Sequence, residues 1–257
     1  MPRSQADSSI HDVARWIRDA GSVMVLTGAG ISTDSGIPDF RGPQGVWTKN
    51  PKTERLSDIN AYMAEKELRV EAWRARLEHP AWSAGPNDAH RALADLEAKG
   101  RMDLLVTQNI DGLHQLAGTS PERLIEIHGT LREVMCMECD DRAPMEAALE
   151  RVRDGEDDPR CRACGGILKS ATISFGQSLV ARDLDRALEA AGSCDLFIAA
   201  GTSLTVYPVA HLPRLALAAG ANLAVFNAEP TPFDPEASAV VRTPLAESLP
   251  ALVESVD

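Results

Sequence analysis

The stretch GAGISTDSGIPDFRG, residues 28–42, decides the fold of this chain. It follows VMVL at residues 23–26, an apolar run with the length and β-branched content of a buried strand. Glycines after such a strand allow positive φ angles and let backbone N–H groups approach a phosphate. The dinucleotide fingerprint G-x-G-x-x-G would place its third glycine where this chain has Thr33, and the next glycine is Gly36. The glycines alone fit a nucleotide-binding loop and an ordinary tight turn equally well.

Length and composition restrict the class of protein. The chain has 257 residues, of which 44% are hydrophobic and 25% charged, enough for one large domain with a small insert. The formal net charge of −12 argues against direct nucleic-acid binding, because phosphate contacts need a cationic face. No apolar run approaches the roughly 20 residues of a membrane helix, and residues 1–7 lack a signal-peptide core. We therefore expect a cytoplasmic protein that does not bind a membrane.

Strand and helix patterns alternate along the rest of the chain. Further buried strands are expected at 102–106, 124–127, 195–200 and 223–226. Helices are expected at 10–20, 59–77, 89–99, 183–191, 209–219 and 245–256. Residues 43–58 show no clear periodicity, which is typical of a functional or mobile loop. The alternation predicts an α/β fold with a doubly wound, Rossmann-like parallel sheet.

Four of the five cysteines form two C-x-x-C pairs, Cys136 with Cys139 and Cys161 with Cys164. In a reducing compartment such pairs more often ligate a metal than form disulfides. Two such knuckles flanking a short ribbon predict one structural Zn²⁺ with a filled thiolate shell and no open position for catalysis. A redox pair or fortuitous spacing is the alternative. Cys194, beside a predicted strand, is expected to be a core thiol.

Polar residues that follow the predicted strands are candidates for a ligand site, because open α/β sheets bind ligands at the carboxyl ends of their strands. His128 has a side chain suited to proton transfer near neutrality, and Gly129 beside it would leave space next to the imidazole. A capping or core histidine is the alternative. Asn109 and Asp111, two residues apart in an extended segment, can line one pocket or form an Asx turn.

Three further residues have both a functional and an ordinary interpretation. Arg41 supplies a cation beside the presumed phosphate loop, or a salt bridge at its rim. Phe40 before it covers a pocket or simply packs. His90 lies on the helix expected at 89–99, where a single histidine is more often a surface or core residue than a ligand.

Together these motifs resemble the sirtuins, NAD-dependent protein lysine deacylases, of the bacterial type. The matching segments, in the family's order, are residues 28–41, TQNIDGLH at 107–114, His128-Gly129, the two cysteine pairs and GTSLTVYP at 201–208. The resemblance implies that NAD is a co-substrate, that one structural Zn²⁺ is bound, and that an acyl group passes from lysine to ADP-ribose with release of nicotinamide. Mono-ADP-ribosyl transfer from the same NAD site is the alternative.

The resemblance also implies which residues hold NAD. The turns after the strands at 23–26 and 195–200 would hold the phosphates and the adenosine end. Gln108, Asn109 and Asp111, with Ile37, would form the pocket for nicotinamide and its ribose, and Phe40 would cover it. The full expected set is Gly28, Ala29, Gly30, Thr33, Asp39, Phe40, Arg41, Trp47, Gln108, Asn109, Ile110, Asp111, Gly201, Thr202, Ser203, Asn227 and Leu245.

Catalytic and substrate roles are implied in the same way. His128 would deprotonate a ribose hydroxyl as general base, and Asn109 is the second expected catalytic residue. The acyl-lysine protein or peptide would lie as a strand between residues 173–177 and 204–207. Its expected contacts are Ile173, Phe175, Gly176 and Val206.

The resemblance divides the chain and also shows departures from the family. The catalytic domain would span 8–257, with a Rossmann-like part at 8–58, 86–130 and 176–257, a helical insert at 59–85 and a zinc-binding insert at 131–175. Gln177 replaces a usual glutamate, and Ser170 replaces a usual proline. Residues 42–48 are similar to the branch with chromatin-associated members. Residues 59–77 contain no Tyr-x-x-Arg pair of the desuccinylase branch, so succinyl-lysine is the less expected substrate.

Overall fold

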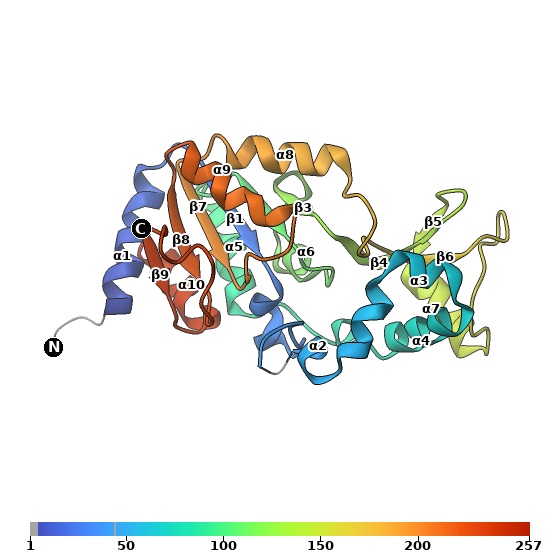
Figure 1. Cartoon of the computed structure of the whole chain (residues 1–257). Helices are drawn as coiled ribbons and strands as arrows, with labels where there is room; N and C mark the ends of the chain where they lie inside the picture. The colour runs from blue at the N-terminus through green and yellow to red at the C-terminus, as the bar shows by residue number, and fades with distance from the viewer. Residues whose placement is uncertain (1–4, 44) are drawn as a thin grey trace.

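A six-stranded sheet forms the larger part of the molecule (Figure 1). The computed structural model describes residues 5–43 and 45–257. The strands are β1 Val23–Thr27, β2 Leu104–Thr107, β3 Leu124–Glu126, β7 Leu196–Ala200, β8 Asn222–Phe226 and β9 Ala239–Val241. All neighbours pair in parallel, in the order β3-β2-β1-β7-β8-β9. The strand order runs outward from the central pair β1 and β7 in both directions. This is the doubly wound arrangement, and it confirms the predicted fold class.

Helices cover both faces of this sheet, so its strands are buried on two sides. In β1, Val23 and Val25 face one apolar cluster, whereas Met24 and Leu26 face the other. The first cluster includes residues of α1 Gln5–Asp19, α5 Asp88–Ala98 and α10 Leu245–Glu254. The second includes residues of α8 Ala181–Ala191 and α9 Leu212–Ala218. This double burial explains why the strands are continuous apolar runs in the sequence.

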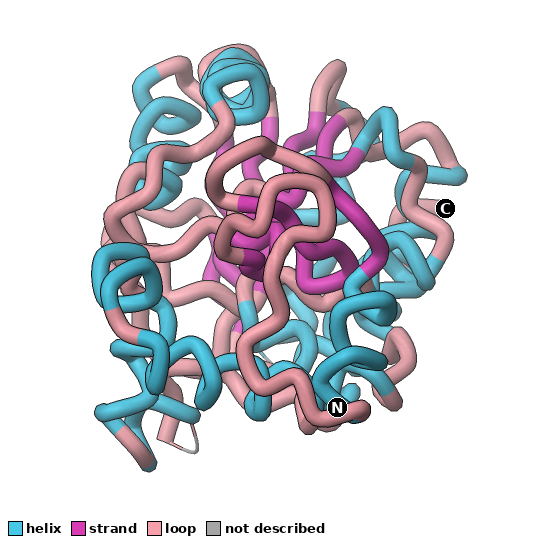
Figure 2. The backbone as a smooth tube through the Cα atoms, turned by 90° about the vertical axis from the view of Figure 1, so that its right-hand side faces the viewer, coloured by secondary structure: helices cyan, strands magenta, loops and turns pink. Residues whose placement is uncertain are grey.

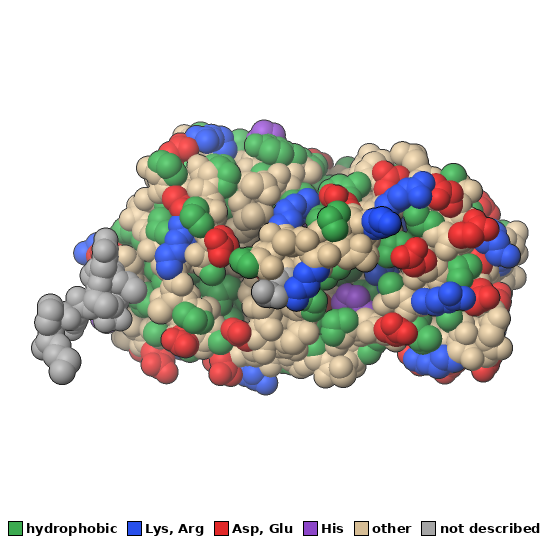
Figure 3. Space-filling model, turned by 60° about the horizontal axis from the view of Figure 1, so that its bottom comes forward, with side chains coloured by type: hydrophobic (Ala, Val, Ile, Leu, Met, Phe, Trp, Pro, Cys, Tyr) green, Lys and Arg blue, Asp and Glu red, His purple; other side chains and the backbone are tan. Residues whose placement is uncertain are grey.

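A smaller part lies at the other end of the molecule (Figures 1 and 2). Its antiparallel sheet has the order β5-β4-β6. The strands are β4 Gly129–Cys136, β5 Arg142–Pro144 and β6 Leu168–Thr172, and the helices are α3 Ile59–Ala64, α4 Lys66–Leu77 and α7 Met145–Arg153. Trp73 of α4 packs with Met145 of α7 and with Val134 of β4 in one apolar cluster. Acidic and basic side chains alternate over the surface of this end (Figure 3).

Several connections differ from the sequence-based expectation. Residues 43–58 contain two short helices, α2 Val46–Lys49 and η2 Pro51–Ser57, which are too short for a periodic pattern. The single helix expected at 59–77 is broken at Glu65, whose backbone is extended. The helix expected at 209–219 is split into η5 Val209–His211 and α9.

The remaining short elements are η1 Ala29–Ser35, η3 Pro80–Trp82, α6 Leu113–Ala117 and η4 Pro121–Arg123. Strand β9, only three residues long, was not predicted. Within the described residues, no helix is long and apolar enough to cross a membrane.

Candidate functional site

The glycines after β1 and β7 meet at the point where the strand order of the sheet reverses. Gly28 N–H donates to Ala200 O at 3.1 Å, and Gly30 N–H donates to Gly201 O at 2.9 Å. A Cβ atom at Gly30 would lie 2.9 Å from Gly201 Cα, and Gly201 has a φ of +65°. Side chains therefore cannot be accommodated where these two turns touch. The reversal point of an open α/β sheet is where such folds bind nucleotides.

The segment after Gly28 is more regular than the polar loop predicted from the sequence. Residues Ala29–Ser35 form the 3₁₀ helix η1, which ends at Gly36 with a φ of +84°. Thr33, at the position of the missing third glycine, donates from its hydroxyl to Gly30 O at 3.0 Å. Thr33 thus stabilises the turn in place of the close helix–strand packing that a glycine would permit.

Asn109, Asp111 and Ser32 form a buried hydrogen-bonded group beside these turns. Ser32 Oγ donates to Asp111 Oδ2 at 2.7 Å. Asn109 Nδ2 donates to Ser32 Oγ and to Gly28 O, both at 3.1 Å. Asp111 Oδ1 also accepts from the N–H of Leu113 at 2.9 Å, which is the local Asx turn given as the alternative interpretation. Ser32 was not among the expected site residues, although it lies in the glycine-rich stretch.

Two neutral histidines lie behind this group. His90 Nε2 is 3.5 Å from Ser32 Oγ, and His114 Nε2 is 3.0 Å from Thr27 Oγ1. The two imidazole rings are 4.8 Å apart. Burial lowers the pKa of His90 to about 4 despite the nearby Asp111 carboxylate. Burial, and then His90, place the pKa of His114 well below its ordinary value. His90 is thus a core histidine, but one that supports the site.

The geometry of His128 suits a base. Its Nδ1 is 3.1 Å from the carbonyl oxygen of Gln108. Because a carbonyl only accepts, Nδ1 carries the hydrogen and Nε2 has its lone pair available. Burial lowers the pKa of His128, which keeps the ring neutral and able to accept a proton. Gln108 in turn donates to Thr202 Oγ1 at 2.7 Å, so the base is connected to the turn after β7.

A glycine is needed at position 129 for a different reason from the one expected from the sequence. Its φ is +72°, and a Cβ there would lie 2.2 Å from Ala171 O. The glycine is therefore required by the close approach of β4 to β6, and this requirement replaces the expectation of free space beside the imidazole.

Aromatic side chains connect the segment after η1 with the expected peptide segment. The ring of Trp47 lies 4.7 Å from that of Phe40 and 5.7 Å from that of Phe175. The guanidinium of Arg41 stacks over Trp47 at 4.6 Å. Asp39 Oδ1 accepts from Gly42 N–H at 2.9 Å and so closes the turn. Arg41 thus rests on an aromatic ring, and within the described residues it forms no salt bridge at the rim.

The other expected nucleotide residues lie at the carboxyl ends of β7 and β8. Ser203 Oγ is 2.8 Å from Thr205 Oγ1, and Asn227 Nδ2 donates to Glu229 O at 2.8 Å. Leu245 begins α10, with its side chain against Gly201. Ile37 and Ile110 pack in a small apolar cluster with Leu113. The structure therefore brings these predicted residues to one edge of the sheet.

The expected peptide segment is held by backbone hydrogen bonds of its own. Ile173 N–H donates to His128 O at 2.7 Å, and Phe175 N–H donates to Ser57 O at 2.7 Å. Ser174 N–H donates to the Gln177 side chain at 2.9 Å. Gln177 can therefore accept this hydrogen bond in place of the glutamate usual in the family. Gly176 has a φ of +87°, and Val206, on the opposite segment, is half-buried.

The four paired cysteines form one compact cluster. Their Sγ atoms all lie within 4.8 Å of one another, with 3.5 Å between Cys136 and Cys164 and 3.7 Å between Cys139 and Cys161. A tetrahedral zinc with Zn–S bonds of about 2.3 Å requires Sγ–Sγ separations of about 3.8 Å. A disulfide requires about 2.05 Å. The donor set thus fits zinc and not a redox disulfide, and Cys194 is buried outside the cluster as expected.

The doubly wound sheet, the glycine turns that meet at the carboxyl ends of β1 and β7, and the four-cysteine cluster together define an α/β protein of the NAD-binding type. The chain belongs to the Sir2 family, whose sequence model matches residues 28–208. It is 49% identical to NAD-dependent protein deacetylase 2 of Streptomyces coelicolor, over 91% of this chain and 97% of the relative. It is 40% identical to NAD-dependent protein deacetylase 1 of Bradyrhizobium diazoefficiens, over 96% of each.

Solved Sir2 structures have the same fold. One contains a deacetylated p53 peptide and 3′-O-acetyl ADP-ribose. It matches with a TM-score of 0.89 and 34% identity, over 95% of this chain and 97% of that one. Another contains a p53 peptide and NAD⁺ and matches with a TM-score of 0.84 and 34% identity, over 95% and 96% of the two chains. The similarity covers both parts of the molecule.

Proposed function

We infer that this member of the Sir2 family is an NAD-dependent protein deacetylase. It transfers the acyl group of a modified lysine to ADP-ribose and releases nicotinamide. The observation that carries this inference is the position of His128, whose Nδ1 contacts Gln108 O. Gln108 is hydrogen-bonded to the turn after β7, and its neighbour Asn109 to the turn after β1. The relatives named as deacetylases match nearly the whole chain and support the same function.

NAD fits the edge where the glycine turns meet. Gly28, Gly30 and Gly201 present a side-chain-free cradle for the phosphates, and Ala29 and Thr33 lie on the same turn. Ser203, Asn227 and Leu245 are placed to hold the adenosine end. Bound NAD supplies a ribose carbon that loses nicotinamide and becomes bonded to the acyl oxygen.

The chain's own residues orient the nicotinamide end and exclude water there. Asn109 and Asp111 are buried, and Ser32 fixes both side chains. An amide and a carboxylate held in this way can bind the carboxamide and the ribose hydroxyls. Phe40 and Trp47 are placed to cover the pocket. His128 Nε2 accepts the proton of a ribose hydroxyl.

The four cysteines hold one structural Zn²⁺. Backbone N–H groups of Glu138 and Gly166 point at Cys136 and Cys164 Sγ from 3.4 Å, which stabilises thiolates. Four thiolates fill a tetrahedral shell, so the metal contributes to folding and not to the reaction.

The protein substrate is expected to pair with the segment that contains Ile173, Phe175 and Gly176, opposite Val206. Within residues 173–177, four N–H groups and the carbonyl groups of Ser174 and Phe175 are already engaged, so pairing there would use the N–H of Gly176 and the remaining carbonyl groups. A cytoplasmic location and the absence of nucleic-acid and membrane binding remain predictions from the sequence.

Product analysis tests the proposed reaction against ADP-ribosyl transfer. With NAD and an acetyl-lysine peptide, mass spectrometry should detect unmodified lysine peptide, nicotinamide and O-acetyl-ADP-ribose. His128→Ala should lower the rate by about 10²–10⁴-fold, with zinc content unchanged, whereas His11→Ala on the exposed side of α1 should not. ADP-ribosylated protein without free lysine peptide would contradict the proposal.

A further inference from the structure

A small cavity lies between α3, α4 and β6, in the part that contains the cysteine cluster. Its polar lining comes from Tyr62, Trp73, Arg76, Lys169, Ser170 and Ser174. Its volume of about 10 Å³ is room for one water molecule or one ion of similar size. None of these side chains has a part in the proposed reaction, and only Ser174 belongs to the segment proposed to pair with the peptide.

Two cations line this cavity without a carboxylate partner. Lys169 is 3% exposed, and its Nζ donates to the carbonyl oxygens of Thr172 and Ser170. Arg76 Nε donates to Ser170 Oγ at 3.3 Å. Within the described part of the chain, neither residue takes part in an ion pair. Lys169 is buried and Arg76 is half-buried, and cations withdrawn from water are normally paired, because desolvated charge is costly.

Trp73 adds a hydrogen-bond donor that lacks an acceptor. Its indole N–H is buried and has no partner among the described residues, and the side chain is only 1% exposed. The nearby Trp82 shows the usual situation, since its indole N–H donates to Arg76 O at 2.6 Å. Buried donors without acceptors are rare and point to an unseen ligand.

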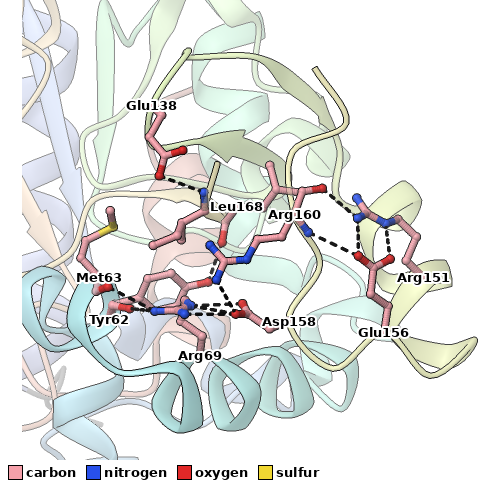
Figure 4. A network of polar contacts seen from close by, with 10 residues as sticks. Tyr62, Met63, Arg69, Glu138, Arg151, Glu156, Asp158, Arg160 and Leu168 are labelled. Atoms are coloured by element: carbon pink, nitrogen blue, oxygen red, sulfur yellow. Dashed lines mark hydrogen bonds and ion pairs between the residues drawn. The ribbon is translucent and has the colours of Figure 1, made fainter. Parts of the chain in front are cut away.

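The groups around the cavity do not supply a negative charge. Tyr62 donates its hydroxyl to Leu168 O at 2.8 Å, and burial raises its pKa further above its ordinary value, so it stays neutral. The Asp158 carboxylate, which acts electrostatically on Tyr62, forms ion pairs with Arg69 and Arg160 at 3.1 and 3.2 Å. Figure 4 shows Arg69 between this carboxylate and the backbone oxygens of Tyr62 and Met63.

We propose that the cavity binds one small monovalent inorganic anion, of which chloride is the commonest. The Trp73 indole N–H, the Arg76 guanidinium and the Lys169 ammonium are its ligands. A water molecule could accept from Trp73 but would leave both cations uncompensated. Burial, and then Arg76, lower the pKa of Lys169 to about 7, so its charged form is disfavoured there unless an anion compensates it. The bound anion joins α4 to β6.

Thermal unfolding at constant ionic strength tests this site. Replacing sodium gluconate, whose anion is too large for the cavity, with sodium chloride should raise the Tm saturably, by about 2 °C or more. Lys169→Met should abolish the difference between the salts and Trp73→Phe should reduce it. Lys66→Met, on the exposed side of α4, should leave it unchanged. Equal Tm values of the wild type in both salts would overturn the proposal.

Crystals of the wild-type protein soaked in sodium bromide provide a test that does not depend on a variant that folds. An anomalous peak within hydrogen-bond distance of Trp73 Nε1 is expected. A water molecule at that position and no bromide would overturn the proposal. Neither readout requires NAD or a peptide, so failure of the anion site would leave the proposed deacetylase activity unaffected.

Discussion

The polar groups under the glycine turns and those beside α4 differ in how charge is buried. Under the turns, the Asp111 carboxylate is bonded by the neutral Ser32 hydroxyl, and His90 behind it is also neutral. Beside α4, Arg69 and Asp158 form an ion pair with side chains only 5% and 4% exposed. Neutral donors fix a group in position and leave its charge available to a ligand, whereas a full ion pair neutralises itself. The first arrangement suits a reaction site, and the second suits a structural joint.

Loss of the metal should have the largest effect of the changes considered, because it affects the folding of the whole smaller part. Cys136→Ala removes a ligand from the module on which β4 and α7 pack, so the small part should lose its tertiary structure. Binding of structural zinc is worth about 10–16 kcal/mol in small modules. Zinc content by atomic absorption and near-ultraviolet circular dichroism would measure the loss. Cys194→Ala should keep its zinc, and full zinc content in Cys136→Ala would contradict the assignment.

Breaking the buried ion pair should have the next largest effect. Asp158→Asn leaves Arg69 and Arg160 without their carboxylate, which we expect to cost about 3–5 kcal/mol of unfolding free energy. Urea denaturation would measure it. The exposed pair of Arg214 and Glu236 provides the control, because Glu236→Gln should cost less than about 1 kcal/mol. Equal costs for the two variants would remove the distinction between the networks.

Acid should weaken the neutral network through His90. Its pKa is about 4 in the folded chain, against an ordinary value of 6.5. Between these values the unfolded chain takes up a proton that the folded protein resists, so stability falls as the pH falls, by up to about 3 kcal/mol. His90→Asn should reduce the difference in unfolding free energy between about pH 7 and about pH 5, whereas His11→Asn should not. An unchanged pH dependence would argue against a neutral His90.

Removing the hydroxyl that joins Asn109 to Asp111 should have the smallest effect on stability. Ser32→Ala leaves Asp111 Oδ2 without its donor, at a cost of about 1–3 kcal/mol. The side chains of Asn109 and Asp111 are then no longer held in a fixed position relative to each other. We therefore expect kcat/KM to fall by about 10- to 100-fold, which is more than the small loss of stability would explain. Ser193→Ala, in the turn after α8, is the control. A variant with a lower Tm but wild-type kcat/KM would make Ser32 a purely structural residue.

Features that depend on local sequence could be predicted, whereas contacts between residues that are distant in the sequence could not. The runs of β1 and β7 were predictable because strands buried on both faces are continuously apolar. Strand β4 mixes exposed, half-buried and buried positions, and β6 is buried throughout but contains the polar residues Lys169, Ser170 and Thr172, so neither strand shows a regular hydrophobic period in the sequence. The C-x-x-C spacing identified the thiolate cluster, since its ligands are local in the chain. The contact of Ser32 with His90 joins residues 58 positions apart, and only the tertiary structure brings them together. Arg41 stacks on Trp47 through a loop without a periodic pattern.

The central claim is that NAD binds where the two glycine turns meet. It is tested most directly by measuring the NAD affinity of a variant at that point. A Cβ at Gly30 would contact the backbone of Gly201 and occupy the proposed phosphate cradle, whereas a Cβ at Gly85 would meet open space. Isothermal titration with NAD should give at least about tenfold weaker binding for Gly30→Ala, with unchanged binding for Gly85→Ala and folded protein by circular dichroism in both. Wild-type affinity in folded Gly30→Ala would contradict the placement of NAD at this edge.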